Sequence, residues 1–122
     1  MATLIFLTLV LLQIKHWYID FVDQNIFEFN HKGVYGHWLG MQHSLKHGIG
    51  TAVCVGLVVG PAYWPASIMM GVIDAVLHYH IDWAKMNWGN RDKENPSFWA
   101  HLGLDQMAHQ LTYLGLVAII AL

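Results

Sequence analysis

Four long apolar segments occupy most of this 122-residue chain and constrain its fold more than any other feature. They run from about residue 2 to 24, 36 to 59, 62 to 85 and 97 to 122. Each has roughly the 20 residues that an α-helix needs to cross a bilayer. With 56% hydrophobic and 11% charged residues, the chain has too few polar side chains to cover so much apolar surface in water. The sequence therefore predicts an all-α integral membrane protein with one domain, residues 1–122.

Polar residues gather in one half of each segment. They fall late in the first and third segments and early in the second and fourth. In a four-helix up-down-up-down bundle with short connections, all four polar halves meet at one end. All six Lys and Arg residues lie at that end or in its loops, so the positive-inside rule places it in the cytoplasm and both termini on the opposite side. Five tryptophans fall near the same level, as an interfacial belt does: Trp17, Trp38, Trp83, Trp88 and Trp99.

The apolar run from residue 1 to 12 has the character of a signal peptide but lacks its flanking features. No Lys or Arg precedes it, and no small-residue cleavage site follows it. We therefore interpret it as a first span that the mature protein retains. Two Gly-x-x-x-Gly matches, Gly36 with Gly40 and Gly56 with Gly60, favour close contacts between helices.

Each segment also carries a pair of His or Asp residues spaced four apart, which places both side chains on one helix face. The pairs are His16 with Asp20, His43 with His47, His78 with Asp82, and Asp105 with His109. Inward-pointing His and carboxylate side chains are how helix bundles build metal sites, including two-metal sites. We expect these eight residues to bind one or two divalent transition metal ions, Zn or Fe/Mn, or to orient the ligands. Pairing of His with Asp across helices, without metal, is the alternative.

Neighbouring polar residues are expected to have other roles. His80 is about 200° around the helix from His78 and should face away from the site. His31 and His37 lie in or beside the first loop and are expected to be solvated. Lys85 stays near the site face, where it is available to pair with Asp82 or Asp74 or to hold an anionic headgroup.

The motifs resemble a family of small bacterial and phage membrane proteins grouped as domain of unknown function 3307. The resemblance rests on His16-x-x-x-Asp20-Phe21-x-x-Gln24, on His78-x-x-x-Asp82-x-x-Lys85 and on Asp105-Gln106-x-x-His109, in that order along nearly the whole chain. It implies a polytopic protein of the bacterial inner membrane with no assigned function. A more distant likeness to inner-membrane proteins described as metal-dependent hydrolases is an analogy.

The leading functional hypothesis is a metal-dependent membrane hydrolase that acts on an ester or phosphoester of a lipid or headgroup. A bound ion would activate water, and Asp74 or Asp105 would serve as general base. The alternatives are a non-catalytic subunit of a larger membrane complex, a protein that binds ions or protons, a His-ligated haem or pigment protein, and a di-iron oxygenase. A homo-oligomer is compatible with all of them, and no basic tract suggests nucleic acid.

Overall fold

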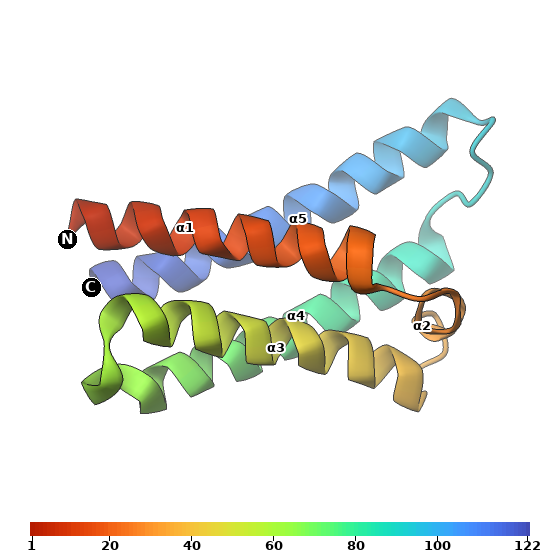
Figure 1. Cartoon of the computed structure of the whole chain (residues 1–122). Helices are drawn as coiled ribbons and strands as arrows, with labels where there is room; N and C mark the ends of the chain where they lie inside the picture. Colours follow the sequence, from red (N-terminus) through yellow and green to blue (C-terminus); the bar gives the residue numbers. More distant parts are fainter.

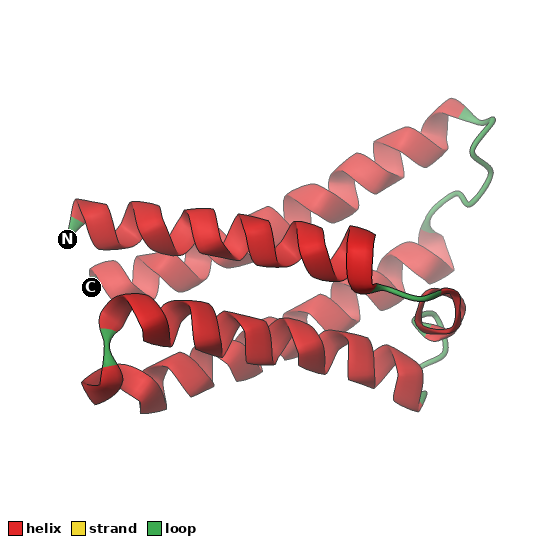
Figure 2. Ribbon diagram, in the orientation of Figure 1, coloured by secondary structure: helices red, strands yellow, loops and turns green.

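The computed structural model describes all 122 residues and contains helices and connections but no strand (Figure 2). Five α-helices, one π-helical segment and one 3₁₀ turn follow one another along the chain. In order they are α1 (Ala2–Trp17), η1 (Tyr18–Asp23), α2 (Ile26–His31), α3 (Trp38–Val59), η2 (Pro61–Tyr63), α4 (Trp64–Trp88) and α5 (Pro96–Ala121). The predicted all-α fold is confirmed, and each of the four apolar segments forms a long helix.

The four long helices form a closed up-down-up-down bundle (Figure 1). Neighbours along the chain pack together, and α1 also packs against α5, so each helix contacts two others. Both termini lie at one end of the bundle, and the connection through α2 and the 89–95 loop lie at the other. At that second end the first half of α5 diverges from the other helices. The fold therefore brings the four polar halves together, as their positions in the sequence predicted.

Proline, glycine and asparagine set the helix boundaries. Gly60 has a φ of 90°, a left-handed conformation that glycine adopts without strain, and it ends α3. Pro61 and Pro65 then occupy the first positions of η2 and α4, where a missing N–H costs nothing. The side chain of Asn95 accepts a hydrogen bond of 3.0 Å from the backbone N–H of Ser97 and caps the last helix.

Two local features differ from the sequence interpretation. The end of the first span is π-helical, with the backbone N–H of Gln24 donating to the carbonyl of Ile19 at 3.0 Å. The predicted polar connection from residue 25 to 35 contains α2, whose cap Asn25 accepts from the Glu28 N–H at 2.9 Å. Short π-helical segments are rare and frequently lie at functional sites. Here the π-helical segment carries Asp20.

The long helices α3 and α4 approach each other closely between Gly48 and Gly71. A Cβ atom on Gly48 would lie 2.6 Å from the Gly71 carbonyl oxygen. The Gly-x-x-x-Gly matches do not mark this contact. Gly40 packs on the backbone of Lys32, Gly56 packs on the ring of Trp64, and the other glycine of each match lies in a turn with positive φ. Of the two matches, Gly56 lies at a close contact between long helices, because Trp64 is the first residue of α4.

Gly48→Ala is expected to force α3 and α4 apart, because the new methyl group would meet backbone that cannot move independently. Overpacking of this kind costs about 1–3 kcal/mol. Thermal unfolding in detergent should show a lower Tm. Gly103→Ala is the matched control, since nothing lies within 4 Å of a Cβ there and alanine favours the helix. Equal Tm values for the two variants would contradict a tight contact at Gly48.

Burial in this bundle is the reverse of that in an ordinary soluble domain. Of 26 buried residues, 15 are polar or charged and seven are large hydrophobics. Large apolar side chains are exposed along every long helix, among them Phe6, Leu57 and Leu111. The small apolar core that does exist lies toward the termini and includes Leu12, Met70 and Leu116.

One helix, Ala2–Asp23, is long and apolar enough to cross a membrane, with a hydropathy of 1.5. Only 28% of the residues in its most apolar stretch are buried in the bundle. The other three long helices are long enough, but because of their polar halves their composition is not apolar enough to mark them as membrane spans. The prediction of four membrane spans thus agrees with the lengths of all four helices. By composition it is supported for the first span alone.

Candidate metal centre

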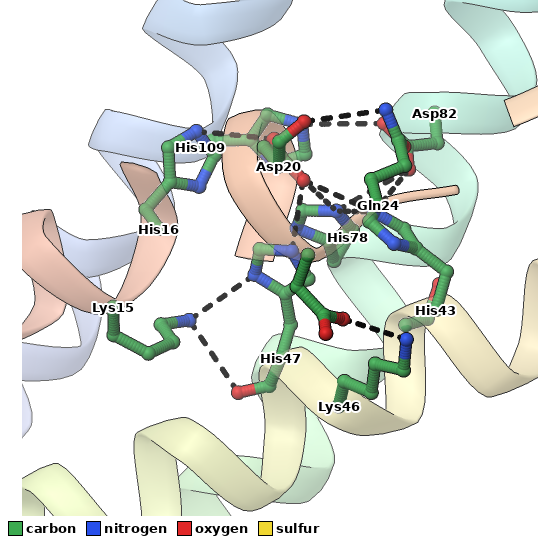
Figure 3. A network of polar contacts seen from close by, with 12 residues as sticks. Lys15, His16, Asp20, Gln24, His43, Lys46, His47, His78, Asp82 and His109 are labelled. Carbon is green, nitrogen blue, oxygen red and sulfur yellow. Dashed lines mark hydrogen bonds and ion pairs between the residues drawn. The ribbon is translucent and has the colours of Figure 1, made fainter. Parts of the chain in front are cut away.

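The eight predicted ligand residues converge inside the bundle. Figure 3 labels all of them except Asp105. Each side chain is at most 7% exposed. The four-residue spacing explains this, because each helix turns both members of its pair to the same side. The long helices contribute as predicted: His16 and Asp20 from α1 and η1, His43 and His47 from α3, His78 and Asp82 from α4, and Asp105 and His109 from α5.

One group of four ligand atoms surrounds Asp20. Its Oδ1 atom lies 3.0 Å from Nε2 of His43, 2.9 Å from Nε2 of His47 and 3.6 Å from Nε2 of His78. The Nε2 atoms of His43 and His78 are 3.3 Å apart. In a tetrahedral zinc site with bonds of about 2.0–2.1 Å, neighbouring ligand atoms are about 3.3 Å apart. Three imidazole nitrogens and one carboxylate oxygen therefore have the spacing of a tetrahedral ligand set.

A second group lies beside the first and contains Asp82, Asp105 and His109. The His109 Nε2 atom is 3.5 Å from Oδ1 of Asp82 and 3.5 Å from Oδ1 of Asp105. Asp82 joins the two groups, because its other oxygen, Oδ2, lies 3.2 Å from Nε2 of His78. The carboxylate thus turns one oxygen toward each group, as a bridging ligand does. His109 Nε2 and Asp105 Oδ1 are buried and have no hydrogen-bond partner.

The imidazole rings of the centre contact one another directly. His47 and His78 stack with centroids 3.6 Å apart, and His78 and His109 stack at 4.1 Å. The three rings come from α3, α4 and α5, so this stack joins three helices. His43 contacts the rings of His47 and His78 at centroid separations of 5.0 and 5.2 Å.

His16 uses both ring nitrogens within the bundle. Its Nδ1 atom lies 2.9 Å from the Tyr113 hydroxyl, and its Nε2 atom lies 2.9 Å from Oε1 of Gln106 and 3.2 Å from Oδ2 of Asp20. An Nε2–H group can donate to either oxygen. In this arrangement His16 holds Asp20 and Gln106 in place. It is also close enough to His78 and His109 to form a third group of donor atoms with them.

Lysine residues balance the buried carboxylates, with one exception. Four acid–lysine pairs are present: Asp74 with Lys15 at 2.9 Å, Asp82 with Lys32 at 3.0 Å, Asp105 with Lys85 at 3.4 Å, and Glu28 with Lys46 at 2.6 Å. Asp20 has no lysine partner and is surrounded by imidazoles. A protonated histidine or a metal cation would supply the neighbouring positive charge that this carboxylate lacks.

Lys32 is the basic residue that comes closest to the centre from outside the four long helices. Burial acts to lower its pKa, but the negative charges of Asp82 and Asp20 outweigh burial and raise the pKa. The amine therefore stays charged. Of the roles left open for Lys85, pairing with Asp82 or Asp74 is not found: Lys32 pairs with Asp82, and Lys85 reaches Asp105.

Asp74, predicted as a general base, lies apart from the imidazole groups. Its Oδ2 atom accepts hydrogen bonds from Lys15 at 2.9 Å and from the Thr51 hydroxyl at 2.5 Å. Lys15 also donates to the Tyr113 hydroxyl at 3.0 Å and contacts Nδ1 of His47 at 3.3 Å. Asp74 thus belongs to a buried ionic network behind the ligand groups. Asp105, the other candidate base, lies in the second group.

Sequence reasoning missed several polar residues of the centre. Lys15, Glu28, Lys32 and Tyr113 are all buried and all contact predicted site residues. A lysine within a predicted span, as at Lys15, is a signal that could have been used. Glu28 and Lys32 stand in the connection that contains α2, where no periodic pattern points inward.

The remaining histidines that were set aside lie outside the centre, as predicted. His80 is exposed, and its Nε2 atom lies 3.0 Å from the hydroxyl of Tyr35. His31 and His37 stack on each other at 4.2 Å beside the first connection.

A pocket lies beside the centre. It has a volume of about 340 Å³ and is lined by Asp20 and Asp105, one residue from each ligand group. Phe98 and Leu102, which also line it, belong to the first half of α5, the part that diverges from the other helices (Figure 1). The pocket also touches the 89–95 loop through Asn90 and Arg91.

Together, the fold and the site define an all-helical bundle with buried His and Asp groups that can hold a metal ion. No protein-family model, curated protein or solved structure matches the chain. The resemblance to the domain of unknown function 3307 family therefore stays a prediction.

Proposed function

We propose that this protein is an integral membrane metal-dependent hydrolase, with its metal centre in the cytoplasmic half of the bundle. The observation that carries the proposal is the convergence of three Nε2 atoms on Oδ1 of Asp20 at 2.9–3.6 Å. A divalent ion bound there would activate water and polarise an ester or phosphoester.

The membrane assignment is supported by the reversed burial pattern. Exposed apolar side chains on every long helix are unfavourable in water but match a lipid environment. Buried ionisable groups inside spans are costly, so they are found where they pair or serve a function. Trp17, Trp38, Trp88 and Trp99 are all exposed near the polar end, as residues of an interfacial belt would be. We place that end in the cytoplasm, since the basic residues lie there.

A metal ion fits the centre better than hydrogen bonds alone. Without an ion, Asp20 Oδ1 has to serve three imidazoles, two of which approach each other at 3.3 Å through the same Nε2 atoms. A cation bound by the group would coordinate all four atoms and would supply the positive charge that balances Asp20. The donor set of imidazole and carboxylate suits Zn, Fe or Mn, and the bridging position of Asp82 suits two ions.

The open pocket favours catalysis over a purely structural ion. A catalytic metal needs a free coordination position, which the three-residue group of Asp82, Asp105 and His109 would leave. It also needs a path for substrate, and the pocket reaches both ligand groups. Asp105 lines this pocket, so it is the carboxylate best placed to act as general base.

Two alternatives are less compatible with the geometry. The imidazoles stack directly on one another at 3.6 and 4.1 Å, so no macrocycle fits between them. An ion or proton path would need polar groups through the other half of the bundle, which contains the apolar core of Leu12, Val55 and Met70. A non-catalytic subunit is the second candidate. In such a protein the buried ion pairs would serve only to hold the helices together.

Elemental analysis of protein purified in mild detergent tests the proposal. We expect one or two equivalents of Zn, Fe or Mn per chain, and hydrolysis of p-nitrophenyl esters or phosphoesters that is lost with a chelator and restored by the metal. Preparations free of metal under every condition would overturn it. Bound metal without hydrolysis would favour the non-catalytic subunit.

A further inference from the structure

The pocket beside the metal centre has an unusual concentration of positive charge. Four of the six basic residues of the chain line it, namely Lys32, Lys85, Arg91 and Lys93. Asp20 and Asp105 are its only acidic residues. The lining therefore has two more positive than negative side chains before any metal cation is added. Such a cavity attracts anions.

Two of these cations have no acidic partner. Lys32 and Lys85 pair with Asp82 and Asp105, whereas Arg91 and Lys93 form no ion pair and are exposed. A planar guanidinium and an ammonium group are the side chains that most often bind phosphate. The pocket thus offers free cationic donors on its outer side and metal ligands on its inner side.

The loop that carries Arg91 and Lys93 is held against α5. The Asn90 backbone N–H donates to Nδ1 of His101 at 2.7 Å, and the Asn90 side chain donates to the Ser97 hydroxyl at 2.7 Å. The Trp99 indole N–H donates to the Lys93 carbonyl at 3.2 Å. These bonds hold the backbone next to Arg91 and at Lys93. The loop is therefore a formed part of the pocket wall.

The pocket wall also contains apolar and unpaired groups. Phe21, Phe98 and Leu102 line it beside the charged residues. Gln24, another lining residue, has a buried Oε1 atom with no hydrogen-bond partner. That oxygen can accept a hydrogen bond from a ligand hydroxyl. Cationic donors, an unpaired acceptor and aromatic surface together suit a ligand that is both anionic and partly apolar.

We propose that this pocket binds the phosphate group of a phosphate ester, with Arg91 and Lys93 as its outer anion donors. The inference rests on the proposed function, since it names the substrate class that the metal centre would act on. The phosphate would enter between the 89–95 loop and the metal ions, and the organic part would lie along Phe21 and Phe98. A lipid headgroup and a soluble phosphate ester share this chemistry.

Calorimetric titration of the metal-containing protein in neutral detergent tests the proposal. The probes are glycerol 3-phosphate, dihexanoyl phosphatidic acid and dihexanoylglycerol, which separate the phosphate from the acyl chains. We expect both phosphate probes to bind and the double variant Arg91→Gln/Lys93→Gln to weaken their binding at least about tenfold, because two charge-assisted contacts are lost. Asp92→Asn/Glu94→Gln is the matched control, since it changes two charges of the same loop that do not line the pocket.

The three probes also distinguish the source of the phosphate. Much tighter binding of phosphatidic acid assigns a lipid headgroup, and equal binding assigns a soluble ester. The proposal is overturned if dihexanoylglycerol binds as well as phosphatidic acid, or if the Arg91/Lys93 variant binds like the wild type. Metal content, measured on each preparation, reports separately on the proposed function. If the protein contains metal but binds neither phosphate probe, this inference is wrong and the proposed function is not affected.

Discussion

Replacing His78 with alanine is expected to remove most of the bound metal and to abolish hydrolysis. His78 belongs to two of the three donor groups, and its Nε2 atom lies within 3.6 Å of Asp20, Asp82 and His43. Loss of groups that merely orient ligands typically costs 10–100-fold in metal affinity. Loss of this ligand should therefore cost more than about 100-fold. Elemental analysis after gel filtration, together with competition against a chelator of known affinity, measures the change.

His80→Ala is the matched control for that experiment. It lies two residues along the same helix, and its side chain is exposed and contacts Tyr35 instead of the centre. We expect it to keep wild-type metal content. Because His78 is fully buried, its removal also leaves a cavity. His78→Gln fills more of that space, and its helical circular dichroism should match the wild type. Full metal content in both His78 variants would show that His78 is not a metal ligand and would contradict the proposed centre.

The sequence was sufficient to predict the four long helices and the convergence of the eight His and Asp residues, because both depend on helical periodicity. Apolar length defined the four long helices, and four-residue spacing placed His43 with His47 and His78 with Asp82 on inward faces. Because the polar residues fall late in the first and third segments and early in the second and fourth, an antiparallel bundle brings them to the same end. These are local patterns, and each is repeated on more than one helix.

The partners of the ligand residues could not be predicted in the same way. Which lysine reaches which carboxylate depends on helix rotation, and Lys85 reaches Asp105 across to α5 instead of a carboxylate on its own helix. Lys32 enters the site from a connection that α2 shapes, which no periodicity describes. The π-helical segment around Asp20 and the Gly48–Gly71 contact also arise from tertiary packing.

Breaking the buried pair between Lys15 and Asp74 is expected to be among the most destabilising changes in the protein. Their side chains are 6% and 1% exposed, and their atoms are 2.9 Å apart. Removing one partner of a buried pair costs about 3–5 kcal/mol, because the other charge stays buried without compensation. We expect Lys15→Met and Asp74→Asn each to lower the free energy of unfolding by about this amount, as measured by denaturant unfolding in detergent.

The double variant Lys15→Met/Asp74→Asn decides what Asp74 does. If the pair only stabilises the bundle, the double variant should be more stable than either single variant, because no unpaired charge remains. Asp74 is in none of the donor groups, so the metal should stay bound. Hydrolysis should then persist, with Asp105 as the base. Retained metal and restored stability without hydrolysis would instead assign the general base to Asp74, whose carboxylate would have to leave Lys15 and Thr51 to reach a substrate.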